Sequence, residues 1–92
     1  LFIMSRMLVI TSGVQDMIRK NELKEEEVQY SIDSFRIDNW GDVAEEDKES
    51  LKKNTDSLNS GGEGMVMGSY LQDRLWIIRN SESTTVLLPS EY

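Results

Sequence analysis

The chain has 92 residues, of which 38 % are hydrophobic and 29 % are charged, and its net charge is −7. This length suits one domain spanning residues 1–92, and the acidity argues against binding to a nucleic-acid backbone, which requires a basic surface. Because the chain contains no cysteine and no histidine, disulfides, thiolate zinc sites, cysteine nucleophiles and histidine general bases are excluded.

The first ten residues (LFIMSRMLVI) are apolar but too few to span a membrane, and they lack the basic region and the small-residue cleavage site of a signal peptide. We therefore expect no membrane association and a cytoplasmic location. Met4 is the expected native start, with residues 1–3 as extra sequence before it. Residues 6–10 (RMLVI) are β-branched and apolar, and they predict a short strand.

A helix is expected directly after this strand. Ser12 and Gln15 have the spacing of a capping box, and Val14, Met17 and Ile18 fall on one helical face. A strand that leads into a helix can also bind an anion through free backbone N–H groups. A single glycine does not make a phosphate loop, however, so we expect Ser12 to act only as a cap.

Residues 21–39 predict a second helix. Glutamates gather in its early turns, where they suit the positive end of the helix dipole. Val28, Ile32 and Phe35 form its expected buried stripe. Tyr30 and Ile37 lie off this stripe and are expected to contact neighbouring elements.

An acidic run, NWGDVAEED, follows at residues 39–47. Trp40 and Gly41 are expected to end the second helix, since glycine tolerates the left-handed conformation of helix ends. Asp42 is expected to cap the next helix in a box with Glu45, and the remaining carboxylates would occupy its first turn. The alternative is a magnesium site, but the spacing matches no calcium loop and no histidine assists, so we expect no metal and no cofactor.

A third helix is expected to run to about Leu58, with Leu51, Asn54 and Leu58 on one face. Asn54 is a polar residue aimed at the interior, where it requires a hydrogen-bond partner. We expect that partner to be the backbone of a loop or of a strand end, and a ligand contact is the alternative. Residues 59–64 (NSGGEG) predict a flexible linker.

The second half predicts a β-meander. Its β-rich runs are residues 65–71, 74–78 and 84–88, separated by a reversal at Gln72-Asp73 and by a polar turn, and Pro89 ends the last strand. A two-residue turn at Gln72-Asp73 sets the register between the first two runs. The expected pairs are Leu71 with Arg74, Tyr70 with Leu75, Ser69 with Trp76, and Met67 with Ile78.

This register gives the sheet two apolar faces. One carries Met65, Met67, Leu71, Trp76 and Ile78, and the other carries Val66, Tyr70, Leu75 and Ile77. We assign an exposed interface to Val66, Tyr70, Leu75 and Ile77, since helices in so small a chain can cover only one face. The alternative is that the helices and the N-terminal strand cover both faces. The expected fold is α+β, with an N-terminal strand and two to three helices packed on an antiparallel sheet of three to four strands.

The C-terminal half contains the motifs W-G-D, E-D, N-x-x-x-L, S-x-Y, W-I-I and T-T-x-L-L-P-x-E-Y. The residues that carry them are Trp40, Gly41, Asp42, Glu46, Asp47, Asn54, Leu58, Ser69, Tyr70, Trp76, Ile77, Ile78, Thr84, Thr85, Leu87, Leu88, Pro89, Glu91 and Tyr92. In these motifs the chain resembles a group of small plasmid- and phage-related bacterial proteins. The hairpin at Gln72-Asp73 is shorter than in that group, and the turn RNSES also differs. The resemblance implies a mobile-element setting but no particular activity.

From its size, acidity and lack of histidine, we expect a non-enzymatic protein that binds a protein partner, such as a host or phage defence or nucleic-acid-processing protein. No catalytic residue is expected. One alternative is a small-ligand site or minor enzyme with a shallow polar and aromatic pocket. Its candidate residues are Asp42, Glu46, Asn54, Tyr70, Trp76, Thr84 and Thr85. Another alternative is a self-associating module, which would be a homodimer formed through a strand edge or a sheet face.

Overall fold

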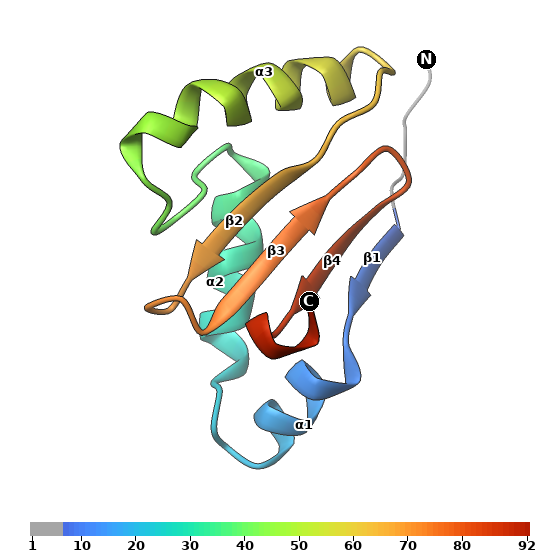
Figure 1. Ribbon diagram of the computed structural model, residues 1–92. Helices are drawn as coiled ribbons and strands as arrows, with labels where there is room; N and C mark the ends of the chain where they lie inside the picture. Colours follow the sequence, from blue (N-terminus) through green and yellow to red (C-terminus); the bar gives the residue numbers. More distant parts are fainter. Residues whose placement is uncertain (1–6) are drawn as a thin grey trace.

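The computed structural model describes residues 7–92 and shows an α+β fold built on a four-stranded sheet (Figure 1). In chain order the elements are β1 (Met7–Ile10), α1 (Ser12–Arg19), α2 (Glu25–Arg36), the short 3-10 helix η1 (Glu45–Asp47), α3 (Lys48–Asn59), β2 (Val66–Tyr70), β3 (Leu75–Arg79), β4 (Ser83–Leu87) and the short 3-10 helix η2 (Pro89–Glu91). The expected native start at Met4 and the residues before it lie outside the described part of the chain.

The sheet is mixed rather than wholly antiparallel. Its strand order is β1-β4-β3-β2, in which β2, β3 and β4 form the predicted meander and β1 pairs with β4 in parallel. All three helices lie between β1 and the meander in the sequence, and a connection of this length permits parallel pairing. Figure 1 shows α2 behind the sheet, α1 at the lower end of β1 and α3 beside β2.

The β2–β3 hairpin has the predicted register but a different turn. The pairs Tyr70–Leu75, Ser69–Trp76 and Met67–Ile78 form as expected. The connection is four residues long, and Leu71, Gln72 and Asp73 all have positive φ, at 56°, 59° and 63°. Arg74 donates its N–H to the carbonyl of Tyr70 at 3.1 Å, so the predicted Leu71–Arg74 strand pair becomes part of the turn. The register survives because positions 71 and 74 face each other in either geometry.

Thr11, and not Ser12, caps α1. The Thr11 side chain accepts a hydrogen bond from the Val14 N–H at 3.4 Å, and Ser12 is already the first helical residue. The Gln15 side chain donates to the Ile10 carbonyl at 2.8 Å instead of closing a capping box. The prediction was one residue late because serine and threonine both cap well and stand side by side here.

The C-terminus is fastened to the start of α1 by Glu91. Its Oε1 accepts hydrogen bonds from Thr11 Oγ1 at 2.7 Å and from the Leu88 N–H at 2.8 Å, and its Oε2 accepts one from the Gly13 N–H at 3.3 Å. These bonds, the one from Leu88 foremost, lower the pKa of Glu91. A charged Glu91 therefore ties η2 to the opposite end of the chain.

The second helix is shorter than predicted, at Glu25–Arg36 instead of 21–39. Asn21 has a φ of 60° and turns the chain before the helix. At the other end Asp38 has a φ of 63°, and the Asn39 N–H donates to the carbonyl of Ser34 at 2.9 Å, which closes the last turn. Aspartate tolerates this left-handed conformation better than most residues, so the helix ends before Gly41 is reached.

Gly41 therefore has a role other than the predicted helix stop. It forms an isolated parallel bridge to Ser69, where the Ser69 N–H donates to the Trp40 carbonyl at 3.0 Å and the Asp42 N–H donates to the Ser69 carbonyl at 2.7 Å. Gly41 has a φ of +76°, and a Cβ at this position would collide with the carbonyl oxygen of Ser69. Glycine thus allows residues 40–42 to lie directly against the edge of β2.

The acidic run after Gly41 does not cap α3 in the predicted way. Asp42 is bound to β2 through its N–H, and η1 stands between it and α3. The cap residues are Ala44 for η1 and Asp47 for α3, and neither makes a side-chain capping bond. Glu45 pairs instead with Lys48 at 3.0 Å on the surface. The predicted box fails because the bridge to Ser69 fixes Asp42 before the helix begins.

α3 carries the predicted interior asparagine. The Asn54 Nδ2 donates to the carbonyl of Met65 at 3.0 Å, which confirms the expected bond to backbone at a strand end. Ser57, on the same helix, donates its hydroxyl to the carbonyl of Glu63 at 2.9 Å. Two side-chain bonds therefore hold the glycine-rich connection against α3.

One hydrophobic core lies between the helices and the sheet, and it contains the stripe predicted for α2. Its buried members are Val14, Leu23, Val28, Ile32, Phe35, Trp40, Leu58, Val66, Tyr70, Leu75, Ile77 and Val86. Because alternate strand residues point to opposite faces, the strand members of this set all share one face of the sheet. The helices cover this face of the sheet.

Candidate functional site

The sheet face that carries Val66, Tyr70, Leu75 and Ile77 is not an interface. These side chains are 1 %, 5 %, 0 % and 0 % exposed, since α2 and α3 pack over them. The prediction of two apolar faces was correct, but the face that was expected to be exposed is the one that the helices cover. Alternation along a strand separates the two sets of side chains and does not say which set the helices cover.

Tyr70 joins the helical layer to the sheet. Its hydroxyl donates to the carbonyl of Asn39 at 2.6 Å, just beyond the end of α2. Burial raises the pKa of Tyr70 far above its ordinary value, so the hydroxyl stays protonated and remains a donor. A buried aromatic ring with its one polar atom paired is a structural contact.

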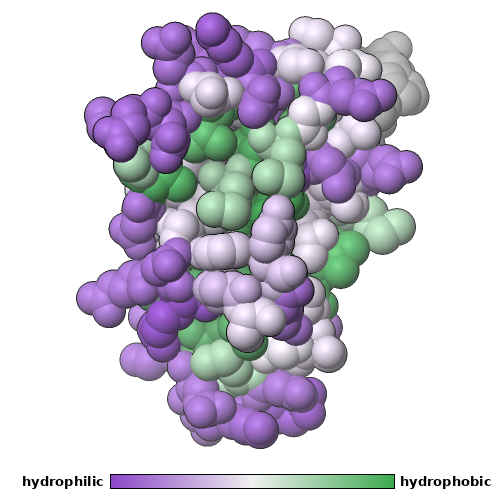
Figure 2. Space-filling view, in the orientation of Figure 1, coloured by the Kyte–Doolittle hydropathy of each residue, from purple (hydrophilic) through white to green (hydrophobic). Residues whose placement is uncertain are grey.

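Within residues 7–92, none of the three α-helices lies over the opposite face of the sheet, which we call the open face. By the register of the four strands, this face carries Met7, Val9, Met67, Ser69, Trp76, Ile78, Ser83, Thr85 and Leu87, and Met65 stands directly before β2. Met7 is 66 % exposed and Met65 is 46 % exposed. Figure 2 shows this side of the molecule, where green and pale residues run through the middle and purple, hydrophilic residues gather around them. An apolar band within a polar rim is typical of an interaction site.

Trp76 is the anchored aromatic of the open face. Its indole Nε1 donates to Asp73 Oδ1 at 2.7 Å, and its ring meets the ring of Tyr92 edge-on at a centroid distance of 5.6 Å. The same Asp73 oxygen accepts the hydroxyl of Ser69 at 2.6 Å. A half-buried tryptophan fixed in this way loses little conformational entropy on binding, which favours a contact role.

Acidic groups surround the open face. Among the described residues, the connections before and after its strands carry Glu63, Asp73, Glu82 and Glu91, with Arg74 as their one basic residue, and Asp42 lies beside the edge of β2. The hydrogen bonds from Ser69, foremost, and Trp76 lower the pKa of Asp73, which keeps that carboxylate charged at neutral pH. The rim therefore has a negative potential around an apolar centre.

The seven residues proposed for a small-ligand site do not come together. Asp42 lies in the loop after Gly41, Glu46 is exposed on η1, and Asn54 is engaged with Met65 on α3. Thr84 and Thr85 point to opposite faces of β4, Trp76 shares the open face with Thr85, and Tyr70 is buried on the other face. Asp42 and Tyr70 line a common hollow, of about 190 Å³, beside the end of α2.

Neither a metal site nor a membrane-spanning helix is found among the residues that the structure describes. Within residues 7–92 no group of three or more acidic side chains is placed to hold a metal ion. In the same stretch, none of the helices has the length and apolarity needed to cross a lipid bilayer.

Met7, Val9, Arg36 and Arg79 were not among the site residues expected from the sequence, whereas Thr84 was. Met7 and Val9 belong to the predicted first strand, but their place on the open face depends on parallel pairing with β4. Comparisons of the chain with protein-family models, with curated proteins and with solved structures find no match.

Proposed function

We propose that this chain is a non-enzymatic interaction domain that binds a protein partner through the open face. The observation that carries the proposal is the absence of a helical cover, within residues 7–92, over a sheet face centred on Met67, Trp76 and Ile78. Such a face exposes apolar area that a partner can remove from water, at roughly 25 cal/mol per Å². Trp76 is already oriented by Asp73 and Tyr92.

The negative charge of the rim indicates what kind of surface a partner presents. The rim of carboxylates favours a basic surface with an apolar centre, and it disfavours a second copy of the same acidic face. A nucleic-acid-processing protein has such a surface in its substrate groove. In the bacterial mobile-element setting that the sequence resemblance implies, the domain would occupy that groove in the cytoplasm and modulate the enzyme.

The test uses three forms of the protein as bait in a bacterial lysate. They are the wild type, Met67→Glu on the open face, and Tyr30→Glu as the matched control. Tyr30 is 69 % exposed on α2, on the other side of the molecule. Captured proteins are identified, purified and titrated against each bait at two salt concentrations.

The proposal predicts a basic partner whose affinity falls as salt rises, because the rim charges are screened. Met67→Glu should weaken binding by about tenfold or more, as expected for a charge placed in an apolar contact, while Tyr30→Glu binds like the wild type. Equal loss in both variants, or no partner that discriminates between them, contradicts the proposal. Light scattering on the purified wild type separates the homodimer alternative, which requires a doubled mass.

A further inference from the structure

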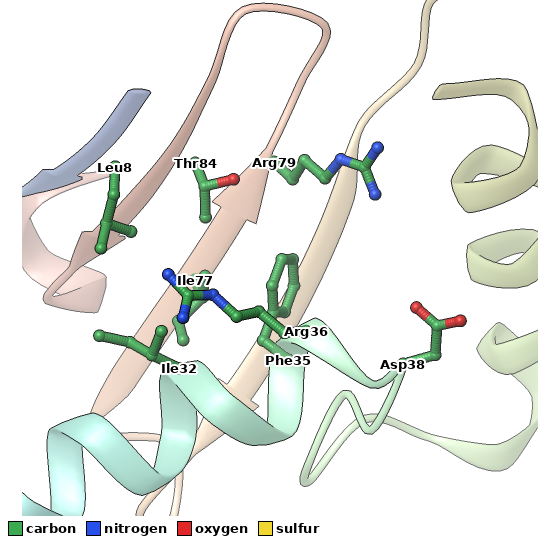
Figure 3. A pocket seen from close by; sticks show the side chains of 8 residues that line it. All are labelled: Leu8, Ile32, Phe35, Arg36, Asp38, Ile77, Arg79 and Thr84. Atoms are coloured by element: carbon green, nitrogen blue, oxygen red, sulfur yellow. The ribbon is translucent and has the colours of Figure 1, made fainter. Parts of the chain in front are cut away.

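A second site lies on the helical side of the sheet, and its chemistry differs from that of the open face. A cavity of about 280 Å³ opens between α2 and strands β1, β3 and β4. Its lining residues are Leu8, Ile32, Phe35, Arg36, Asp38, Ile77, Arg79 and Thr84 (Figure 3). The hollow is near the lower end of the roughly 300–1,000 Å³ that ligand pockets enclose, so its ligand must be small.

The floor and one wall of the cavity are apolar. Ile32, Phe35 and Ile77 belong to the buried core. Leu8, on the edge strand, is 40 % exposed and forms the outer wall. Its apolar side chain stays in contact with water until something fills the cavity.

The polar side of the cavity is cationic, although the whole chain is strongly acidic. Two of its lining residues are arginines and one is an aspartate. In Figure 3 the guanidinium of Arg36 reaches back from the end of α2 toward Ile77, while the carboxylate of Asp38 points the other way. Within residues 7–92 no carboxylate lies within ion-pair distance of Arg36. Its charge is therefore available to a ligand in the cavity.

Arg79 and Thr84 supply the opposite side. They are cross-strand neighbours on β3 and β4, and Arg79 donates through Nη2 to Asn59 Oδ1 at 2.7 Å, which fixes its guanidinium. Figure 3 shows the Thr84 hydroxyl directed toward Arg79. Figure 3 also shows the Arg79 guanidinium directed away from Thr84 and Arg36, so the Thr84 hydroxyl and the Arg36 guanidinium are the donors that suit an anionic head group.

We propose that this cavity binds a small organic monocarboxylate with an apolar body. The carboxylate would accept hydrogen bonds from Arg36 and Thr84 near Arg79, and the apolar body would cover Ile32, Phe35 and Leu8. A guanidinium group recognises a carboxylate through paired N–H donors. This ligand class fits the cavity because a cationic group lies beside an apolar floor. The space is too small for a nucleotide.

Three probes of one length test this assignment by titration calorimetry and by amide chemical shifts. They are octanoate, 1-octanol and octylamine, which share the apolar body and differ in the head group. We expect octanoate to bind saturably and to shift the amides of Ile32, Phe35, Ile77 and Thr84. The alcohol should bind about tenfold more weakly, since it lacks the charge-assisted bonds, and the amine more weakly still.

Two variants and one control then locate the head group. Arg36→Gln should weaken octanoate by about tenfold or more and leave octanol unchanged, and Thr84→Val should weaken octanoate severalfold. Arg19→Gln removes the same charge from α1, where Arg19 forms an exposed pair with Asp16, and should have no effect. The assignment is overturned if octanoate does not bind at millimolar concentration, if octanol binds equally well, or if Arg19→Gln weakens octanoate as much as Arg36→Gln. The amide chemical-shift changes of the wild type on adding octanoate locate the binding site even if a variant misfolds.

Discussion

The carboxylate of Asp73 and the indole of Trp76 are joined by a hydrogen bond of 2.7 Å, and the same oxygen accepts the hydroxyl of Ser69. One atom thus connects the turn of the hairpin to both of its strands and to the main aromatic of the open face. This link matters because the turn is costly. Leu71, Gln72 and Asp73 adopt left-handed backbone conformations, which non-glycine residues disfavour by about 1–2 kcal/mol each.

Asp73→Asn should therefore destabilise the fold at neutral pH and do so less at acidic pH. The hydrogen bonds from Ser69 and Trp76 lower the pKa of Asp73 in the folded state. A carboxylate with a lowered folded pKa contributes stability above its unfolded pKa, about 3.9, and loses that contribution as the pH falls through the folded value. Asparagine resembles the protonated acid, so urea midpoints of variant and wild type should differ at pH 7 and converge as the pH falls through the lowered pKa of Asp73.

Asp42→Asn is the matched control for this experiment. Asp42 lies on the same rim, and its side chain has no hydrogen bond to any residue of the described chain. Its replacement should leave the urea midpoint at pH 7 nearly unchanged. A gap for Asp73→Asn that persists at low pH would show that the charge of Asp73 is not what holds the turn.

Gly41→Ala should cost more stability than Gly61→Ala, although both glycines have positive φ, at +76° and +87°. A Cβ on Gly61 meets nothing within 4 Å, so only the left-handed conformation is penalised, by about 1–2 kcal/mol. A Cβ on Gly41 collides with the backbone of Ser69, which adds about 1–3 kcal/mol of forced displacement. Denaturant unfolding measures both values. Equal losses would mean that residues 40–42 do not need to approach β2 closely.

The features predicted correctly from the sequence are those set by the regular spacing of apolar residues along one helix or one hairpin. The stripe of Val28, Ile32 and Phe35 and the register of β2 with β3 depend on neighbours within one element or one turn, and both were predicted correctly. The end of α2 at Arg36 was missed because the left-handed Asp38 and the hydrogen bond from Asn39 to Ser34 end the helix before Gly41. The parallel pairing of β1 depends on contacts distant in the sequence and was not predicted.

The candidate sites were harder to predict for the same reason. The apolar residues of the open face were predicted from the sequence as one of two alternating sets. Which of the two sets stays uncovered depends on where α2 and α3 pack, and this was not predicted. The composition of the two faces differs slightly and weakly indicates which one is covered. Ser69 and Thr85 on the open face are polar, whereas Leu75, Ile77 and Val86 on the covered face are apolar. The cavity combines Arg36 from a helix with Arg79 and Thr84 from two strands. No spacing in the sequence relates these positions.

Replacing one residue on each face tests which face the helices cover. Leu75→Ala removes a fully buried side chain from the core and should cost about 2–5 kcal/mol of unfolding free energy. Met67→Ala removes a half-buried side chain from the open face and should cost about 1 kcal/mol or less. Urea unfolding of the two purified variants gives both numbers. The reverse order would return the interface to the face of Val66, Tyr70, Leu75 and Ile77.

Asn54→Ala should loosen the entry to β2. The Asn54 amide is the side-chain donor to the Met65 carbonyl at 3.0 Å, and a bond of this kind contributes about 1 kcal/mol. Losing it should speed amide hydrogen exchange at the start of β2 more than in β3, because Met65 is no longer held to α3. Lys52→Ala, on the exposed side of the same helix, changes the helix surface without touching this contact and serves as the control. Unchanged exchange in Asn54→Ala would show that the backbone of β2 holds its position without α3, and that the interior placement of this asparagine has another cause.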